Sequence, residues 1–163
     1  MSMNVAFIGL GAMGYPMAGH LSKGGFNTTV YNRNDSKATR WLKDFPDGAK
    51  QASPKLAATS ANVVLLCVGN DQDVRSVVYG DNGVLAGMSS GDILIDHTTT
   101  SAELSREIFH SAKELGIQFL DAPVSGGQAG AENGKLTVMC GGDDAAFSRA
   151  EPLMSCYGAR VTH

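Results

Sequence analysis

The stretch that decides the fold is FIGLGAMGYPM, residues 7–17. It contains the glycine spacing Gly9-x-Gly11-x-x-Gly14. This spacing alone is a weak signal, because glycine-rich turns are common. Here, however, an apolar run precedes it and a stretch with helical periodicity follows it, so it occupies the first turn between a strand and a helix. The context therefore favours a phosphate-binding turn over a turn in which the glycines have only a steric role.

Each glycine of this turn has its own physical reason. Gly9 permits the tight turn, Gly11 lets the backbone approach a pyrophosphate, and Gly14 allows the helix to pack closely on the strand. The N-terminus of the helix adds free N–H groups and a partial positive charge. We therefore expect a dinucleotide to bind along Gly9, Leu10, Gly11, Ala12, Met13 and Gly14.

Outward from this turn, short apolar runs alternate with amphipathic stretches. The sequence predicts strands at 4–8, 27–32, 62–68, 92–96, 117–121 and from Lys135 onward, and helices at 12–24, from 35, from 54, at 71–78, from 101 and at 143–156. A β-α-β-α order predicts an α/β fold of the Rossmann type, a doubly wound and mostly parallel sheet with helices on both faces.

Several helix starts carry capping signals. The predicted caps are Asp35 or Ser36, Ser53 followed by proline, Thr100 in the capping box TSAE, and Asp143 or Asp144. The helix after the capping box should bury one face, formed by Leu104, Ile108, Ala112 and Leu115.

The end of the second strand bears on the choice of cofactor. Sites that prefer NAD usually place an acid there to bind the ribose 2′-hydroxyl, but this chain has Asn32 and then Arg33. An arginine can pair with the 2′-phosphate of NADP, which a carboxylate would repel. We therefore favour NADP over NAD, although Asp35 nearby would weaken that preference. The alternative interpretation is a solvated surface arginine.

Three further strand ends should meet at the same edge of the sheet: CVGN (67–70), DHTTT (96–100) and DAPVSGG (121–127). Val68 and Gly69 have small side chains, so the backbone here would lie close beneath the nucleotide. Thr98 would meet the nicotinamide carboxamide, or equally serve the turn before the next helix. His97 is tempting as an acid/base, but a lone histidine after a strand is more often structural.

The composition excludes several classes of protein. The chain has 163 residues, the size of one domain, and a net charge of −3, which does not favour nucleic acid or an anionic membrane. No apolar run approaches the roughly 18 residues that a membrane span needs. The three cysteines are scattered without metal-ligand spacing, so we expect no metal site and buried thiols in a reducing cytoplasm.

The combination of GLGAMG, NRN, DHTTT and DAPVSGGQAGAENGKL resembles the β-hydroxyacid dehydrogenase family. The resemblance covers the whole chain, and the run from Asp121 to Gly127 is its most specific part. It implies that Ser125, Gly126 and Gly127 hold the carboxylate of the substrate. A hydroxyl group and backbone N–H groups at a glycine-rich turn can indeed form an anion site.

The resemblance also implies hydride transfer between NADP or NAD and a small 3-hydroxy acid or semialdehyde, in a homo-oligomeric enzyme with a lysine as general acid/base. No lysine follows Lys135, and the chain ends at YGARVTH, about where the family's lysine motif should begin. We therefore expect residues 1–163 to be the NAD(P)-binding domain without the family's all-helical domain, and inactive alone. Two alternatives stay open: a relative of imine reductases and a non-catalytic dinucleotide-binding module.

Overall fold

A parallel sheet of six strands forms the centre of the computed structural model, which describes residues 3–163. The strand order is β3-β2-β1-β4-β5-β6, and every pairing is parallel. The bounds are β1 Asn4–Ile8, β2 Asn27–Tyr31, β3 Ala49–Lys50, β4 Val63–Leu66, β5 Ile93–Asp96 and β6 Gln118–Asp121. The predicted Rossmann-type α/β fold is confirmed.

The central strands are covered on both faces. All four residues of β4 and all four of β5 are buried, as expected for the continuous apolar runs of a parallel sheet. The strand order reverses between β1 and β4. Ligands of open α/β sheets bind at such a switch point, beyond the carboxyl ends of the strands.

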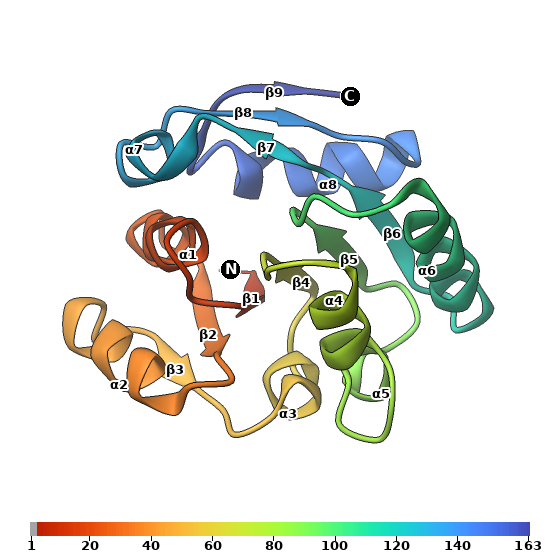
Figure 1. Cartoon of the computed structure of the whole chain (residues 1–163), viewed down its shortest axis with the longest axis horizontal. Helices are drawn as coiled ribbons and strands as arrows, with labels where there is room; N and C mark the ends of the chain where they lie inside the picture. Colours follow the sequence, from red (N-terminus) through yellow and green to blue (C-terminus); the bar gives the residue numbers. More distant parts are fainter. Residues whose placement is uncertain (1–2) are drawn as a thin grey trace.

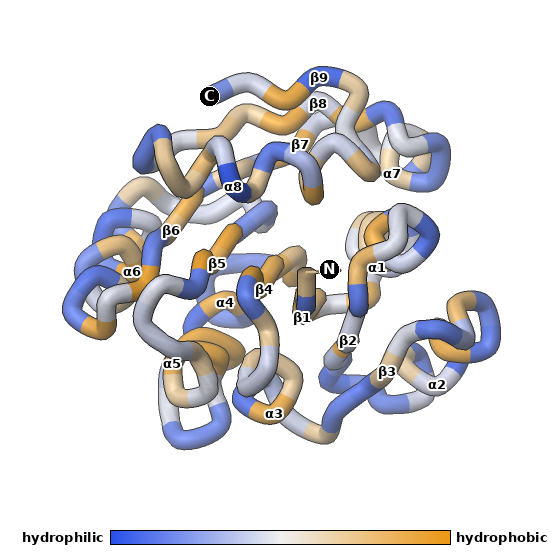
Figure 2. Tube along the Cα trace, turned by 180° about the vertical axis from the view of Figure 1, so that it is seen from behind, coloured by the Kyte–Doolittle hydropathy of each residue, from blue (hydrophilic) through white to orange (hydrophobic). Residues whose placement is uncertain are grey.

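The helices divide between the two faces of the sheet. Buried residues of α1, α2 and α8 share one hydrophobic cluster, and those of α3, α4, α5 and α6 share the other. Figure 1 shows α1 and α8 on one side of the row of strands and α3, α4 and α5 on the other. Hydrophobic residues lie on strands β4, β5 and β6 of this sheet (Figure 2). The bounds are α1 Gly14–Lys23, α2 Asp35–Asp44, α3 Pro54–Ala58, α4 Asp71–Val78, α5 Val84–Gly87, α6 Ala102–Glu114 and α8 Asp144–Met154.

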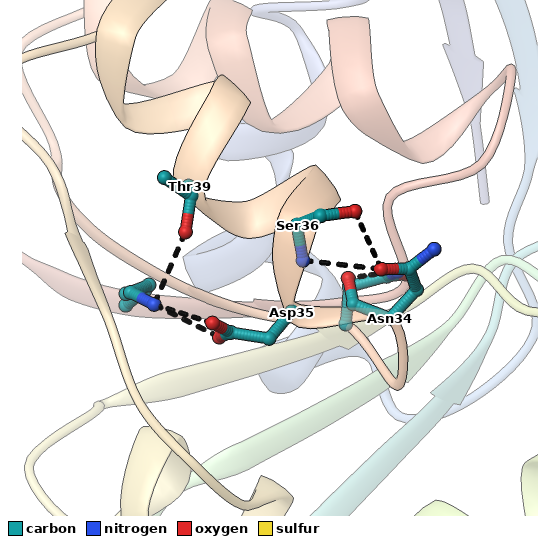
Figure 3. Close-up of polar contacts among 6 residues, drawn as sticks. Asn34, Asp35, Ser36 and Thr39 are labelled. Carbon is teal, nitrogen blue, oxygen red and sulfur yellow. Dashed lines mark hydrogen bonds and ion pairs between the residues drawn. The ribbon is translucent and has the colours of Figure 1, made fainter.

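Two predicted caps were wrong by one residue, and two were right. Helix α2 is capped by Asn34, whose side chain accepts from the backbone N–H of Ser36 (Figure 3). Helix α6 is capped by Ser101 rather than Thr100, because Asp71 fixes the Ser101 backbone N–H and hydroxyl. Ser53 and Asp143 cap α3 and α8 as predicted.

One residue of the predicted core is on the surface. Leu115 is 50% exposed, because α6 ends before it and its backbone is no longer helical. The other three predicted core residues of this helix are fully buried.

The last predicted strand does not extend the main sheet. It forms β8 (Leu136–Met139), which pairs with β7 (Val124–Ser125) and β9 (Gly158–Thr162) in a second sheet. This sheet lies along the top of Figure 1, next to α7 (Gly127–Glu132). The strict β-α-β-α order therefore fails after β6. Pro123 follows that strand and has no N–H to continue its ladder, and a bridge between Asp121 and Gly141 joins the two sheets.

Candidate functional site

A cavity of about 790 Å³ lies at the switch point. Its walls come from the loops after β1, β2 and β4, from α4 and from the start of α3. The residues that line it include ten of the predicted cofactor residues: Gly9, Leu10, Gly11, Ala12, Met13, Gly14, Asn32, Arg33, Val68 and Gly69.

The three glycines of the first turn differ in what surrounds them. Gly9 has a φ of 104°, and a Cβ there would collide with the carbonyl oxygen of Cys67. A Cβ on Gly14 would collide with the carbonyl oxygen of Gly9. A Cβ on Gly11 would meet nothing within 4 Å. The fold therefore requires Gly9 and Gly14, whereas Gly11 borders open space on the cavity wall.

Asn32 holds the glycine turn against the end of β2. Its Oδ1 accepts from the backbone N–H of Leu10 at 2.8 Å, and its Nδ2 donates to the carbonyl of Asn34 at 2.9 Å. Both ends of the amide are therefore used within the chain. The side chain fixes the direction in which the turn presents its backbone to the cavity.

The mouth of the cavity beside α2 is basic. The Arg33 side chain is 89% exposed, and Lys37 also lines the cavity. Asp35, the acid that would disfavour a phosphate, pairs with the ammonium of Lys50 at 2.7 Å, and the same ammonium donates to Thr39. Figure 3 shows Asp35 and Thr39 beside the Asn34 cap. The carboxylate nearest Arg33 in sequence is thus already paired.

Thr98 supports the loop that follows β4. Its Oγ1 accepts from the backbone N–H of Val68 at 3.0 Å, and its own N–H donates to Asp96 Oδ1 at 2.9 Å. Thr98 is only 3% exposed and is not among the described residues that line the cavity. The Thr98 hydroxyl therefore supports the loop after β4. Its predicted contact with the nicotinamide carboxamide stays a prediction.

Asp96 is buried and Cys67 is half-buried at this edge of the sheet. Burial raises the pKa of the Asp96 carboxyl to about 6, and its Oδ2 has no hydrogen-bond partner. Burial also raises the pKa of the Cys67 thiol to about 12, so this thiol stays protonated and is a poor nucleophile. Among residues 3–163, no group of three or more His, Cys, Asp and Glu side chains is arranged to hold a metal ion.

His97 is a structural residue. It is 2% exposed, and its Nδ1 lies 2.6 Å from the carbonyl oxygen of Ala122, which can only accept. The proton is therefore on Nδ1, and Nε2 accepts from the hydroxyl of Tyr157 at 2.6 Å. Burial lowers the pKa of His97 to about 4, so the ring is neutral at pH 7. The structural interpretation of this histidine agrees with the contacts.

Ser125, Gly126 and Gly127 lie apart from the large cavity, on the exposed connection from β7 into α7. Both glycines have positive φ angles, 133° and 65°, which glycine adopts without strain. The next residue, Gln128, lines a second cavity of about 550 Å³. This cavity shares Leu10, Gly11, Ala12 and Lys37 with the first, whereas Ser125, Gly126 and Gly127 themselves are not among the described residues that line either cavity.

Residues 4–163 match the model of a protein family described as the NAD binding domain of 6-phosphogluconate dehydrogenase. The chain belongs to this family. Its most specific sequence signals and the geometry of its switch point agree with that membership, which makes it an NAD(P)-binding domain.

Relatives of this NAD-binding domain are oxidoreductases. An uncharacterized oxidoreductase of Shewanella frigidimarina is 58% identical over 94% of this chain and 52% of its own length. The solved 3-hydroxyisobutyrate dehydrogenase of Mycobacterium tuberculosis with L-serine is 32% identical, with a TM-score of 0.90 over 99% of this chain and 54% of that one. An imine reductase from Myxococcus stipitatus in complex with NAD⁺ shares the fold at 20% identity and a TM-score of 0.90, over 100% of this chain and 55% of that one.

The chain spans about half the length of the relatives that it matches. Within residues 3–163, no helix has both the length and the apolar character needed to cross a membrane.

Sequence reasoning missed several residues around the cavity of this domain. Lys37 was detectable in principle, because it lies in the first turn of the helix that follows Arg33. Asn34, Ser53 and Pro54 belong to segments that the sequence analysis singled out for other reasons. For the remaining residues only the fold shows that they line the cavity: Ile8, Tyr31, Ala52, Cys67, Asp73, Ser76, Val77, Tyr79 and Asn82.

Proposed function

We propose that this chain is the cofactor-binding part of an NADP-dependent oxidoreductase of small 3-hydroxy acids or the matching semialdehydes. The observation that carries the proposal is the open space beside Gly11, on the wall of a cavity of about 790 Å³ at the switch point. The fold does not require a glycine there, so a ligand that approaches the backbone closely explains it best.

The residues divide into binding and positioning roles. The turn from Gly9 to Gly14 presents backbone N–H groups and the N-terminus of α1 to the phosphates. Asn32 and Thr98 have positioning roles, because their hydrogen bonds hold the loops after β1 and β4. Val68 and Gly69 also line the cavity, and Val68 lies beside Gly9. A bound nicotinamide dinucleotide would supply the hydride chemistry.

The charges at the cavity mouth support NADP as the preferred cofactor. Arg33 offers a guanidinium group that is 89% exposed, and Lys37 adds a second positive charge. Asp35 is neutralised by Lys50 at 2.7 Å. A 2′-phosphate would meet two cations here, and charge-assisted contacts of this kind contribute about 1.5–3 kcal/mol each.

Fluorescence titration with NADPH and NADH tests this preference directly. We expect the chain to bind NADPH more tightly than NADH. Arg33→Gln should weaken NADPH binding about tenfold or more and leave NADH binding nearly unchanged. Arg106→Gln on the exposed side of α6 removes the same charge far from the cavity and serves as the control. Equal losses for the two cofactors would contradict the 2′-phosphate contact.

The proposed substrate class rests on the relatives and on the serine-glycine turn. The solved relative named 3-hydroxyisobutyrate dehydrogenase was studied with L-serine, which is itself a small acid with a 3-hydroxyl group. We assign Ser125, Gly126 and Gly127 to the carboxylate of such a substrate. Imine reductases share only the fold at 20% identity, and the intact DAPVSGG run favours the hydroxy acid.

The 163 residues alone should bind NADPH but turn over small hydroxy acids very slowly, because no lysine follows Lys135 to act as the family's proton donor. Absorbance at the NADPH band, with a panel of 3-hydroxy acids and semialdehydes, measures this. A substantial rate would show that a proton donor exists within the chain.

In a polypeptide that does turn over, Ser125→Ala should raise KM for the acid without changing NADPH affinity. An unchanged KM would remove Ser125 from the carboxylate site.

A further inference from the structure

Two oppositely charged side chains face each other across the nucleotide cavity. Arg33 follows β2, and Asp73 belongs to the first turn of α4. Both line the cavity, and Arg33 Nη1 lies 4.0 Å from Asp73 Oδ1. The pair therefore spans the opening between the loop after β2 and the helix after β4.

The carboxylate of Asp73 makes no hydrogen bond within α4. The helix is capped by Asn70, whose side chain accepts from the backbone N–H of Asp73. The backbone carbonyl of Asp73 accepts from the hydroxyl of Ser76. Only the backbone of Asp73 is used in these contacts, so its side chain is free to face the cavity, where it is 33% exposed.

The position of this carboxylate is also enforced from the cavity side. A Cβ on Gly69 would lie 2.6 Å from Asp73 Oδ2, so the side chain packs directly over a backbone that lines the nucleotide site. A negative charge is thereby held at the cavity wall, next to Arg33.

We propose that Asp73 is a specificity-determining residue that acts through Arg33 and sets how strongly this site prefers NADP. The inference rests on the proposed function. Without a 2′-phosphate, Arg33 pairs with Asp73, and a 2′-phosphate must take Arg33 away from that partner. NAD carries a hydroxyl group at this position and does not compete for the guanidinium. Asp73 therefore lowers the affinity for NADP and leaves that for NAD almost unchanged.

The test is Asp73→Asn in the 163-residue chain, with NADPH and NADH titrated separately by fluorescence. Because an exposed ion pair is weak, we expect NADPH binding to tighten about threefold to fivefold and NADH binding to change less than about twofold. The gain should shrink in high salt, which screens exposed charges. Glu114→Gln changes the net charge equally at the far end of α6 and should leave both affinities unchanged. Far-ultraviolet circular dichroism checks that the variant is folded.

The same substitution in an Arg33→Gln background shows whether Asp73 acts through the arginine. We expect the gain for NADPH to disappear there. Three results would overturn the inference. They are a gain in NADPH affinity that survives in the Arg33→Gln background, an equal gain in NADH affinity, and an unchanged ratio of NADPH to NADH affinity in Asp73→Asn alone. These outcomes differ from failure of the proposed function, in which the unaltered chain binds neither NADPH nor NADH.

Discussion

Gly11 is the residue at which folding and binding can be separated. A methyl group at this position meets nothing within 4 Å, whereas one at Gly14 collides with the Gly9 backbone. Gly11→Ala should therefore change the free energy of unfolding by less than about 0.5 kcal/mol but weaken NADPH binding. Gly14→Ala should destabilise the fold by about 1–3 kcal/mol or more, as overpacking does. Urea unfolding and NADPH titration of both variants measure the difference. Unchanged NADPH affinity in Gly11→Ala would count against the phosphate site.

Asp96 and His97 are adjacent, buried and titrate in opposite senses. Burial raises the pKa of Asp96 to about 6, so the stability contributed by its folded environment is present at low pH and is lost as pH rises toward 6. Burial lowers the pKa of His97 to about 4, so its contribution is complete above about pH 6.5 and is lost as pH falls toward 4. Between pH 4 and 6 the two effects oppose each other.

Asp96→Asn tests this balance. The amide keeps an oxygen for the Thr98 N–H but cannot ionise. The variant should be more stable than the natural chain at pH 8 by about 1–3 kcal/mol, since each unit of pKa shift corresponds to about 1.4 kcal/mol. The advantage should vanish near pH 4. The midpoints of urea unfolding of both chains at pH 8 and pH 4 measure this difference in stability. A stability advantage that does not depend on pH would show that ionisation of Asp96 is not its cause.

At the scale of single elements, the first turn of α8 illustrates how much one cap contributes. Asp143 Oδ2 accepts from the N–H groups of Ala145 and Ala146. Asp143→Ala should lower the free energy of unfolding by about 1 kcal/mol, the usual cost of losing a cap. Asp144→Ala, one residue later and exposed, should cost less than about 0.5 kcal/mol. Thermal or urea unfolding compares them, and equal losses would indicate a general charge effect rather than capping.

The sequence predicted the elements of the main sheet well and those of the second sheet poorly, for a physical reason. Buried parallel strands such as β4 appear as uninterrupted apolar runs, so periodicity reveals them. Strands β7 and β9 have two and five residues, and mostly half-buried or exposed positions, so their residues carry no such pattern. The caps at Asn34 and Ser101 were missed by one residue, because each lies in a run of adjacent polar side chains that can all cap a helix; at Ser101 the tertiary contact with Asp71 decides the position. Similarly, Asp73 has no sequence signal, since only folding brings it opposite Arg33.

At the scale of the whole molecule, the second sheet is tied to the main sheet through a buried polar contact. The Tyr157 hydroxyl donates to His97 Nε2, and His97 Nδ1 donates to the carbonyl of Ala122. The tyrosine lies between α8 and β9, and the histidine follows β5. The chain of contacts therefore links the end of the main sheet to the sheet that contains Ser125 and helps to hold the two sheets together.

Tyr157→Phe keeps the buried ring but leaves His97 Nε2 without its donor. An unpaired buried acceptor costs about 1–3 kcal/mol, and we expect the variant to lose stability in that range. Because the contact joins the two sheets, amide hydrogen exchange should accelerate more in β8 (Leu136–Met139) than in β4 (Val63–Leu66). Met154→Leu, a similar-sized change at the buried last residue of α8, is the control and should not produce that difference. Uniform acceleration in both strands would mean that Tyr157 contributes only to global stability and does not fasten the second sheet to the first.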